Sequence, residues 1–158
     1  MKGMKHEGMK GMYIKLAIMA VLSFISMYAF MYMMVYRFAE VYPNVNQFYM
    51  AGLMTAPMVI IEILVMWSMY SNTKANFAVI GVSLVLLALF IAGMRYQTAV
   101  SDTQFLKSMI PHHSGALLMC DNPNIQDPEI KDLCKGIISS QQSEIDWMKK
   151  KVDELGQK

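Results

Sequence analysis

The sequence predicts an all-α membrane protein with three transmembrane helices followed by an extramembrane antiparallel helical hairpin. Hydrophobic residues make up 55% of the 158-residue chain, more than an ordinary soluble domain of this size contains. Most of them fall in three long apolar runs, and the remainder near the C-terminus has the period of two amphipathic helices. We find no internal repeat and no strand pattern.

The three apolar runs cover residues 14–36, 49–70 and 77–94. Each has about 18 residues or more, enough for a helix to cross the hydrocarbon core of a bilayer. The first has no charge after Lys15, the second is broken only by Glu62, and the third has no charge. Because the first run is longer than a signal sequence and no small-residue cleavage site follows it, we expect a retained span.

Positive residues set the expected orientation. Four lysines precede the first span and Lys74 lies in the loop between the second and third, so both segments are expected in the cytoplasm. The chain is then a multi-pass protein of the inner (cell) membrane, surrounded by lipid, with its C-terminal part outside the cytoplasm. The expected regions are a Met- and Lys-rich leader at 1–13, a three-span region at 14–95 and a hairpin domain at 101–156.

Helix signals divide the C-terminal part in two. Ser101 and Gln104 have capping-box spacing, and Pro111 should kink or locally break the helix that follows. Asp127 and Pro128 should begin a second helix. Its expected apolar stripe consists of Ile130, Leu133, Ile137, Ile138, Ile145, Met148, Val152 and Leu155. With nine acidic and seven basic side chains from residue 101 onward, this part has no basic stripe for nucleic acid.

Soft donors gather in this same part. Two of the three histidines are adjacent, at His112 and His113, and both cysteines are close by, at Cys120 and Cys134. Thioethers, thiolates and imidazoles together favour copper(I) or silver(I). These donors suggest a metal site in the C-terminal part.

A register for the hairpin follows if the turn centres near Asp127. Cys120 then lies level with Cys134, and His113 lies level with Gln141. Met109, His113, Gln141 and Glu144 gather within about one helical turn of height, roughly 5 Å.

The residues also resemble a known family. Phe105-Leu106-x-x-Met109-Ile110-Pro111-His112-His113, followed by Gln141-x-x-Glu144-Ile145-x-x-Met148, is similar to the CopM-like domain-of-unknown-function family (number three hundred and five). The resemblance implies a ferritin-like half-bundle, a membrane-anchored subgroup active in heavy-metal resistance, and copper or silver held by Met and His ligands in the periplasm. The site residues that the resemblance implies are Met109, His112, His113, Met119, Gln141, Glu144 and Met148. The cysteines depart from the family pattern, which usually has small residues there.

Several assignments stay open. The cysteines form a disulfide, act as extra thiolate ligands, or are small buried residues. Adjacent helical residues point about 100° apart, so both histidines can face one site only if Pro111 distorts the helix. We expect Glu144 to orient a histidine ring through a hydrogen bond; the alternative is a solvated face.

Two further patterns lie outside the hairpin. The N-terminal residues Met1, Met4, His6, Met9 and Met12 form either a metal-binding run or a basic leader that sets topology. In the second span, Glu62 lies on a methionine stripe, which is most simply a packing or lipid-facing surface. A carboxyl group in hydrocarbon usually faces the bundle interior.

The expected function is a binder that sequesters copper(I) or silver(I) and contributes to metal tolerance. It is not expected to be an enzyme, because a di-metal oxidase needs Glu-x-x-His pairs that the hairpin lacks. We expect a homo-oligomer, since so short a hairpin has little core of its own, and a metal pump or chaperone as partner. The alternative is a metal-independent assembly module of a membrane complex.

Overall fold

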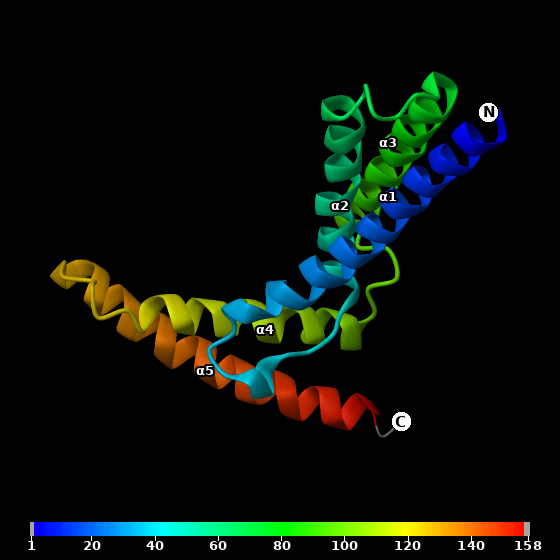
Figure 1. Cartoon of the computed structure of the whole chain (residues 1–158). Helices are drawn as coiled ribbons and strands as arrows, with labels where there is room; N and C mark the ends of the chain where they lie inside the picture. Colours follow the sequence, from blue (N-terminus) through cyan, green and yellow to red (C-terminus); the bar gives the residue numbers. More distant parts are fainter. Residues whose placement is uncertain (1, 157–158) are drawn as a thin grey trace. The chain divides into compact units, whose positions relative to one another are not determined.

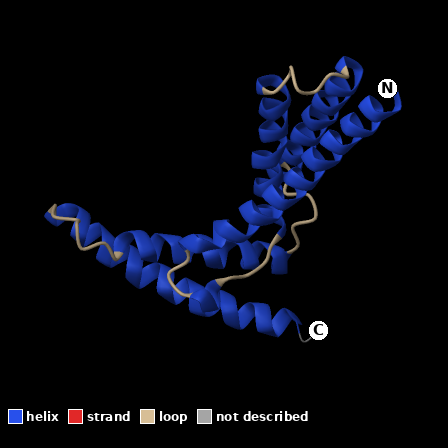
Figure 2. Cartoon of the chain, in the orientation of Figure 1, coloured by secondary structure: helices blue, strands red, loops and turns tan. Residues whose placement is uncertain are grey.

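A computed structural model describes residues 2–156, with only the backbone described for residues 2–10. The described part is helical and contains no strand. Five α-helices follow one another: α1 (Lys2–Phe30), α2 (Val45–Val65), α3 (Thr73–Arg95), α4 (Asp102–Cys120) and α5 (Pro128–Gly156), with short 3₁₀ helices η1 (Met31–Met34) and η2 (Phe38–Glu40) between α1 and α2. Figure 2 shows this helical content along the whole chain.

The chain divides into two compact units. The first, called the span unit, comprises residues 1–30 and 48–98; the second, called the donor unit, comprises residues 31–47 and 99–158. The three helices that are long and apolar enough to cross a membrane cover Gly11–Met34, Val45–Val65 and Thr73–Arg95. The expected spans are therefore present to within a few residues, and they indicate a membrane protein.

Polar side chains fix one end of the span unit. Asn72 accepts a hydrogen bond from the Ala75 backbone N–H and so caps α3. The neighbouring Asn76 is fully buried; its amide donates to the Tyr70 carbonyl at 2.8 Å, and its Oδ1 accepts from the Tyr13 hydroxyl at 2.6 Å. This network ties α1 to the loop between α2 and α3.

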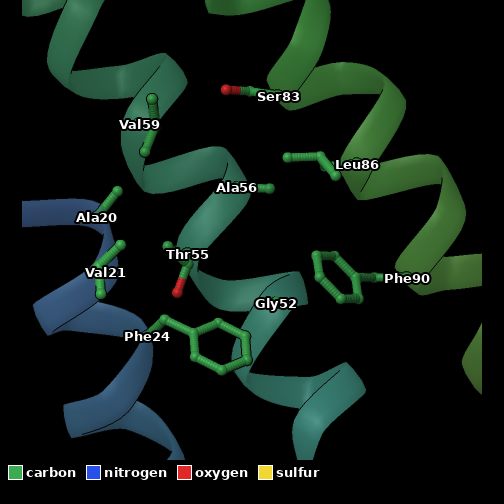
Figure 3. A pocket seen from close by; sticks show the side chains of 10 residues that line it. All are labelled: Ala20, Val21, Phe24, Gly52, Thr55, Ala56, Val59, Ser83, Leu86 and Phe90. Atoms are coloured by element: carbon green, nitrogen blue, oxygen red, sulfur yellow. The ribbon is translucent and has the colours of Figure 1, made fainter. Parts of the chain in front are cut away.

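Glu62 lies near this same end of the span unit. Its carboxyl group interacts with the side chain of Tyr70, a tyrosine partner of the kind expected for a carboxyl group in an apolar span. Earlier along α2, an apolar cavity of about 260 Å³ is lined by side chains of α1, α2 and α3. Figure 3 shows the Phe24 and Phe90 rings facing it from α1 and α3, with Gly52 of α2 between them. A Cβ at Gly52 would collide with the Phe90 ring.

The donor unit is built around α4 and α5, which pack side by side and are joined by the turn that follows Cys120 (Figure 1). Both expected helix starts are confirmed. Ser101 accepts from the Gln104 N–H at 3.4 Å, and Asp127 accepts from the N–H groups of Glu129 and Ile130 at 2.9 and 3.0 Å. The capping box is only half formed, because the Gln104 side chain instead accepts from the Val45 N–H.

An apolar seam between α4 and α5 is the core of the donor unit. It consists of Leu106, Ile110, Leu117, Ile145, Met148 and Val152. The expected stripe on α5 is correct for its second half but wrong near its start, where Ile130, Leu133 and Ile138 are exposed. The buried positions from Cys134 through Ile145 to Val152 keep helical spacing, and Leu133 and Ile138 lie to either side of that line.

The segment Met31–Gln47, called the connecting segment, packs against α4 within the donor unit. The Tyr36 N–H donates to Ser114 Oγ at 2.6 Å, and the Ser114 hydroxyl donates to Glu40 Oε2 at 2.5 Å. Asn44 is buried, caps the start of α2 by accepting from the Gln47 N–H, and donates to the Lys107 carbonyl at 3.4 Å. The connecting segment therefore belongs structurally with the C-terminal helices.

Candidate metal centre

His113 is the best-positioned donor of the predicted site. Its side chain is 11% exposed, with Nδ1 3.0 Å from the Met109 carbonyl oxygen and Nε2 2.7 Å from Oε2 of Glu144. The Met109 carbonyl oxygen can only accept a hydrogen bond, so Nδ1–H donates to it. An ionised carboxylate also only accepts, so Nε2, which is directed at α5, shares a proton with Oε2 of Glu144, and a metal ion at Nε2 would replace that proton. The expected hydrogen bond between Glu144 and a histidine ring is confirmed.

His112 lies outside this arrangement. It is exposed, and its ring centroid is 6.0 Å from that of His113. α4 continues as one helix through Pro111, which has no N–H to donate within it. The 100° between successive helical residues therefore still separates the two rings. The two histidines therefore do not face one site.

The methionines divide in the same way. Met148 is buried in the α4–α5 seam, and Met109 is partly buried against it. Met119, near the end of α4, is 59% exposed. Met109 and Met148 thus lie at the seam, with Met109 one helical turn before His113 on α4, whereas Met119 lies outside it.

Gln141 contributes an unpaired oxygen. Its Oε1 is buried and has no hydrogen-bond partner among the described residues. The expected register placed Gln141 level with His113, yet the imidazole reaches Glu144, three residues later. A buried amide oxygen without a donor is unfavourable, and a cation or a water molecule would relieve it.

The two cysteines lie at the turn end of the helix pair. Both are free thiols, Cys134 is buried and Cys120 is half-buried. Burial raises the pKa of Cys120 from 9.0 to about 11, and its hydrogen bond with Cys134 contributes to the shift. The expected register is therefore correct at this end.

No group of three or more His, Cys, Asp or Glu side chains that could hold a metal ion occurs in the described part of the chain. The predicted donors that α4 and α5 hold at or near the seam are the His113 imidazole, paired with the Glu144 carboxylate, and the Met109 and Met148 thioethers, and Gln141 adds a buried amide oxygen. Such a mixture lacks the several hard or thiolate ligands of zinc and calcium sites. The N-terminal methionines up to Met9, with His6, lie outside the residues whose side chains are described.

Sequence reasoning missed the polar group that surrounds Ser114. Glu40 is fully buried and pairs with Lys149 Nζ at 3.3 Å while accepting from Ser114. These three residues come from the connecting segment, α5 and α4, so no local pattern links them. The one available signal in the sequence was Glu40 itself, the lone acidic residue between the first and second spans. Through Ser114, this pairing fixes the turn of α4 that carries His113.

Comparison with known proteins gives two matches. The family model described as a domain of unknown function (DUF305) matches residues 91–152, which contain all of α4 and most of α5. An uncharacterised protein, L153, of Acanthamoeba polyphaga mimivirus is 34% identical over 113 residues, covering 70% of this chain and 72% of the viral protein.

No solved structure matches the chain. The match to the viral protein extends well beyond the helix pair, because 113 aligned residues exceed the length of the family domain. The chain therefore belongs to the same family as this viral protein, and it carries the domain of unknown function DUF305.

Proposed function

We propose that this protein is a membrane-anchored binder of copper(I) or silver(I) that sequesters the ion and contributes to metal tolerance. The observation that carries the proposal is the His113 ring, which is buried between two helices, held through Nδ1 by a backbone carbonyl and directed through Nε2 at α5. A histidine fixed in this way through one nitrogen is the usual arrangement of a metal ligand.

The proposed binding set uses donors on both helices. His113 Nε2 supplies the imidazole, and Met109 and Met148 supply thioethers from the adjoining seam. Glu144 now occupies the position next to Nε2, but its side chain is 56% exposed, so it can move into solvent as the cation enters. Gln141 Oε1 then gains a positive neighbour. Thioether and imidazole ligands favour copper(I) over harder ions.

The proposed architecture is an antiparallel hairpin that forms half of a ferritin-like bundle. Its exposed apolar side chains on α4 and α5 support self-association, and they are Phe105, Leu118, Met119, Ile130, Leu133, Ile138 and Trp147. A second hairpin packed on these residues would make a four-helix unit. A metal pump or chaperone is the proposed recipient of the ion.

The proposed location is the inner membrane, with the donor unit outside the cytoplasm. The three-span topology explains why the connecting segment and the C-terminal helices share one unit. The chain leaves the connecting segment through α2 and returns through α3, so two crossings bring it back to the same side. The lysines at the N-terminus and at Lys74 favour the cytoplasm for the opposite side.

A copper(I) competition titration tests this function on the full-length protein in detergent micelles. We expect His113→Ala to weaken binding by about 10- to 100-fold, with a further loss in Met148→Leu, which keeps the volume but removes the sulfur. His112→Ala is the matched control, because that ring is exposed, and it should leave the affinity unchanged. Equal affinity in wild type and the His113→Ala, Met148→Leu double variant would exclude the site.

The second candidate is a metal-independent assembly module, supported by the same exposed apolar residues on α4 and α5. It predicts that the full-length protein associates equally well with copper(I), silver(I) or a chelator present. Analytical ultracentrifugation in micelles measures this association. The copper(I) titration distinguishes the two functions, since the metal-binding proposal needs a change of copper(I) affinity in His113→Ala and the assembly module does not.

A further inference from the structure

The cysteine pair is separate from the seam that holds His113. Cys120 is the last residue of α4 and Cys134 lies in the second turn of α5. Cys120 is seven residues from His113, about 10 Å along the helix axis. The two thiols come from different helices and hydrogen-bond with each other, so they form a pair without any larger rearrangement.

A cavity of about 270 Å³ is lined by both cysteines. Its walls include Cys120, Cys134, Lys131 and Lys135, with Ile125 and Ile138 supplying apolar surface. The site therefore offers two soft donors, room for an ion beside them, and two positive side chains at its edge. None of these lysines or cysteines belongs to the binding set proposed around His113.

We propose that Cys120 and Cys134 form a second copper(I) or silver(I) site, a two-coordinate dithiolate at the turn end of the helix pair. Each thiol loses its proton to solvent as its sulfur donates an electron pair to the ion: Cu⁺ + 2 RSH → [RS–Cu–SR]⁻ + 2 H⁺. No electron is transferred and copper remains in the +1 state. The site rests on the proposed preference for soft ions, but not on His113.

Charge complementarity favours this occupant over a structural disulfide. The dithiolate complex carries one negative charge, and Lys131 and Lys135 supply positive charge at the cavity wall, although Lys135 also pairs with Asp132 at 3.3 Å. A disulfide is neutral and would gain no electrostatic stabilisation from these two lysines. Thiolates are also the softest protein ligands available to copper(I), and metal binding replaces their protons.

Thiol protection tests the proposal on the full-length protein in micelles, first reduced and then freed of reductant without oxygen. Copper(I) is supplied as its acetonitrile complex, and N-ethylmaleimide labelling is counted by intact mass over time. We expect copper(I) to slow labelling of both thiols by about tenfold or more, in wild type and equally in His113→Ala. A thiolate-to-copper absorption band should appear in both proteins and be absent from C120A/C134A.

Two outcomes would overturn the second site. Labelling at the same rate with and without copper(I) would exclude it, and so would a pair that closes to a disulfide in air and, once reduced, gains no protection from copper(I). The site around His113 is tested separately in C120A/C134A, which lacks both thiols. Loss of all copper(I) binding in this variant would show that the site around His113 does not bind the ion. If copper(I) still protects the thiols in His113→Ala and does not bind to C120A/C134A, the cysteine site exists and the site around His113 does not.

Discussion

The two units of this chain each have an apolar core and buried polar groups, and they differ most in the side chains that they leave exposed. In the span unit, many large apolar residues are exposed around a small core of Leu16, Val59, Ile63 and Tyr70. In the most apolar 18-residue stretch of each span, the buried share is 6% for the first span, 33% for α2 and 11% for α3, so α2 is the most enclosed. In the donor unit, the apolar residues of α4 and α5 form the buried seam, and charged groups lie mostly outside it.

The difference shows how solvent determines what exposure means. Leu89 of α3 and Leu133 of α5 are each 62% exposed. In the span unit such a side chain meets lipid, which is as apolar as leucine. In the donor unit it meets water or a protein partner. An identical exposed fraction therefore predicts opposite responses to a charged substitution.

The largest expected effect comes from truncating fully buried isoleucines. Ile145 of the donor unit and Ile63 of the span unit are each 0% exposed. Ile145→Ala should lower the unfolding free energy of the donor unit by about 3 kcal/mol, from lost burial and a cavity. Ile63→Ala should lose only packing, about 1 kcal/mol, because lipid provides no hydrophobic driving force between helices. Hydrogen exchange measured by mass spectrometry reads the two units separately, and equal losses would refute the distinction.

Charged substitutions at the two equally exposed leucines come next. Leu89→Lys should weaken membrane insertion by about 2 kcal/mol, seen as a larger fraction extracted by carbonate. Leu133→Lys should change the stability of the donor unit by less than about 0.5 kcal/mol. A large effect of Leu133→Lys on oligomer size would show that a second copy covers this face.

Breaking the buried ion pair of the donor unit should have an intermediate effect. Glu40→Gln leaves Lys149 without its counter-charge, and the Lys149 side chain is 26% exposed. We expect a loss of about 1–2 kcal/mol, below the value for a fully buried pair. Glu154→Gln is the matched control, because its partner Lys151 is at the surface, and it should produce no measurable change in thermal unfolding.

The smallest effect is on thiol reactivity. Burial raises the pKa of Cys120 to about 11, so near pH 8 a smaller share is thiolate than in an ordinary cysteine, and labelling is slower. In the wild-type protein, the rate of iodoacetamide labelling at Cys120, followed by peptide mapping, should keep rising as the pH approaches 11. A rate that levels off near pH 9 would show an ordinary thiol. Labelling of the urea-unfolded protein serves as the control.

Local chemistry in the sequence was enough to predict most of the helices. Apolar run lengths identified the spans, and the Ser101 and Asp127 caps identified the starts of α4 and α5. The pairings of Cys120 with Cys134 and of Glu144 with a histidine also followed, because both depend on the packing of two neighbouring helices in sequence. The position of His112 was predictable from helix geometry once Pro111 left α4 continuous.

Contacts between distant segments were not predictable. Glu40 meets Ser114 and Lys149 across two intervening spans, and no periodicity encodes such a meeting. The outward position of Leu133 was missed because apolar composition alone does not tell a seam residue from its neighbour about 100° away on the helix. The tertiary fold, rather than helix pattern, decides these placements.

X-ray absorption at the copper edge gives the most direct test of the central claim, that His113 and seam thioethers together hold a soft ion. The sample is copper(I)-loaded full-length C120A/C134A protein, which removes the cysteine site. We predict a first shell that contains both nitrogen and sulfur, with the nitrogen lost in a matched His113→Ala sample and sulfur reduced in Met148→Leu. A shell of only oxygen or nitrogen, or a spectrum that neither substitution changes, would contradict the account.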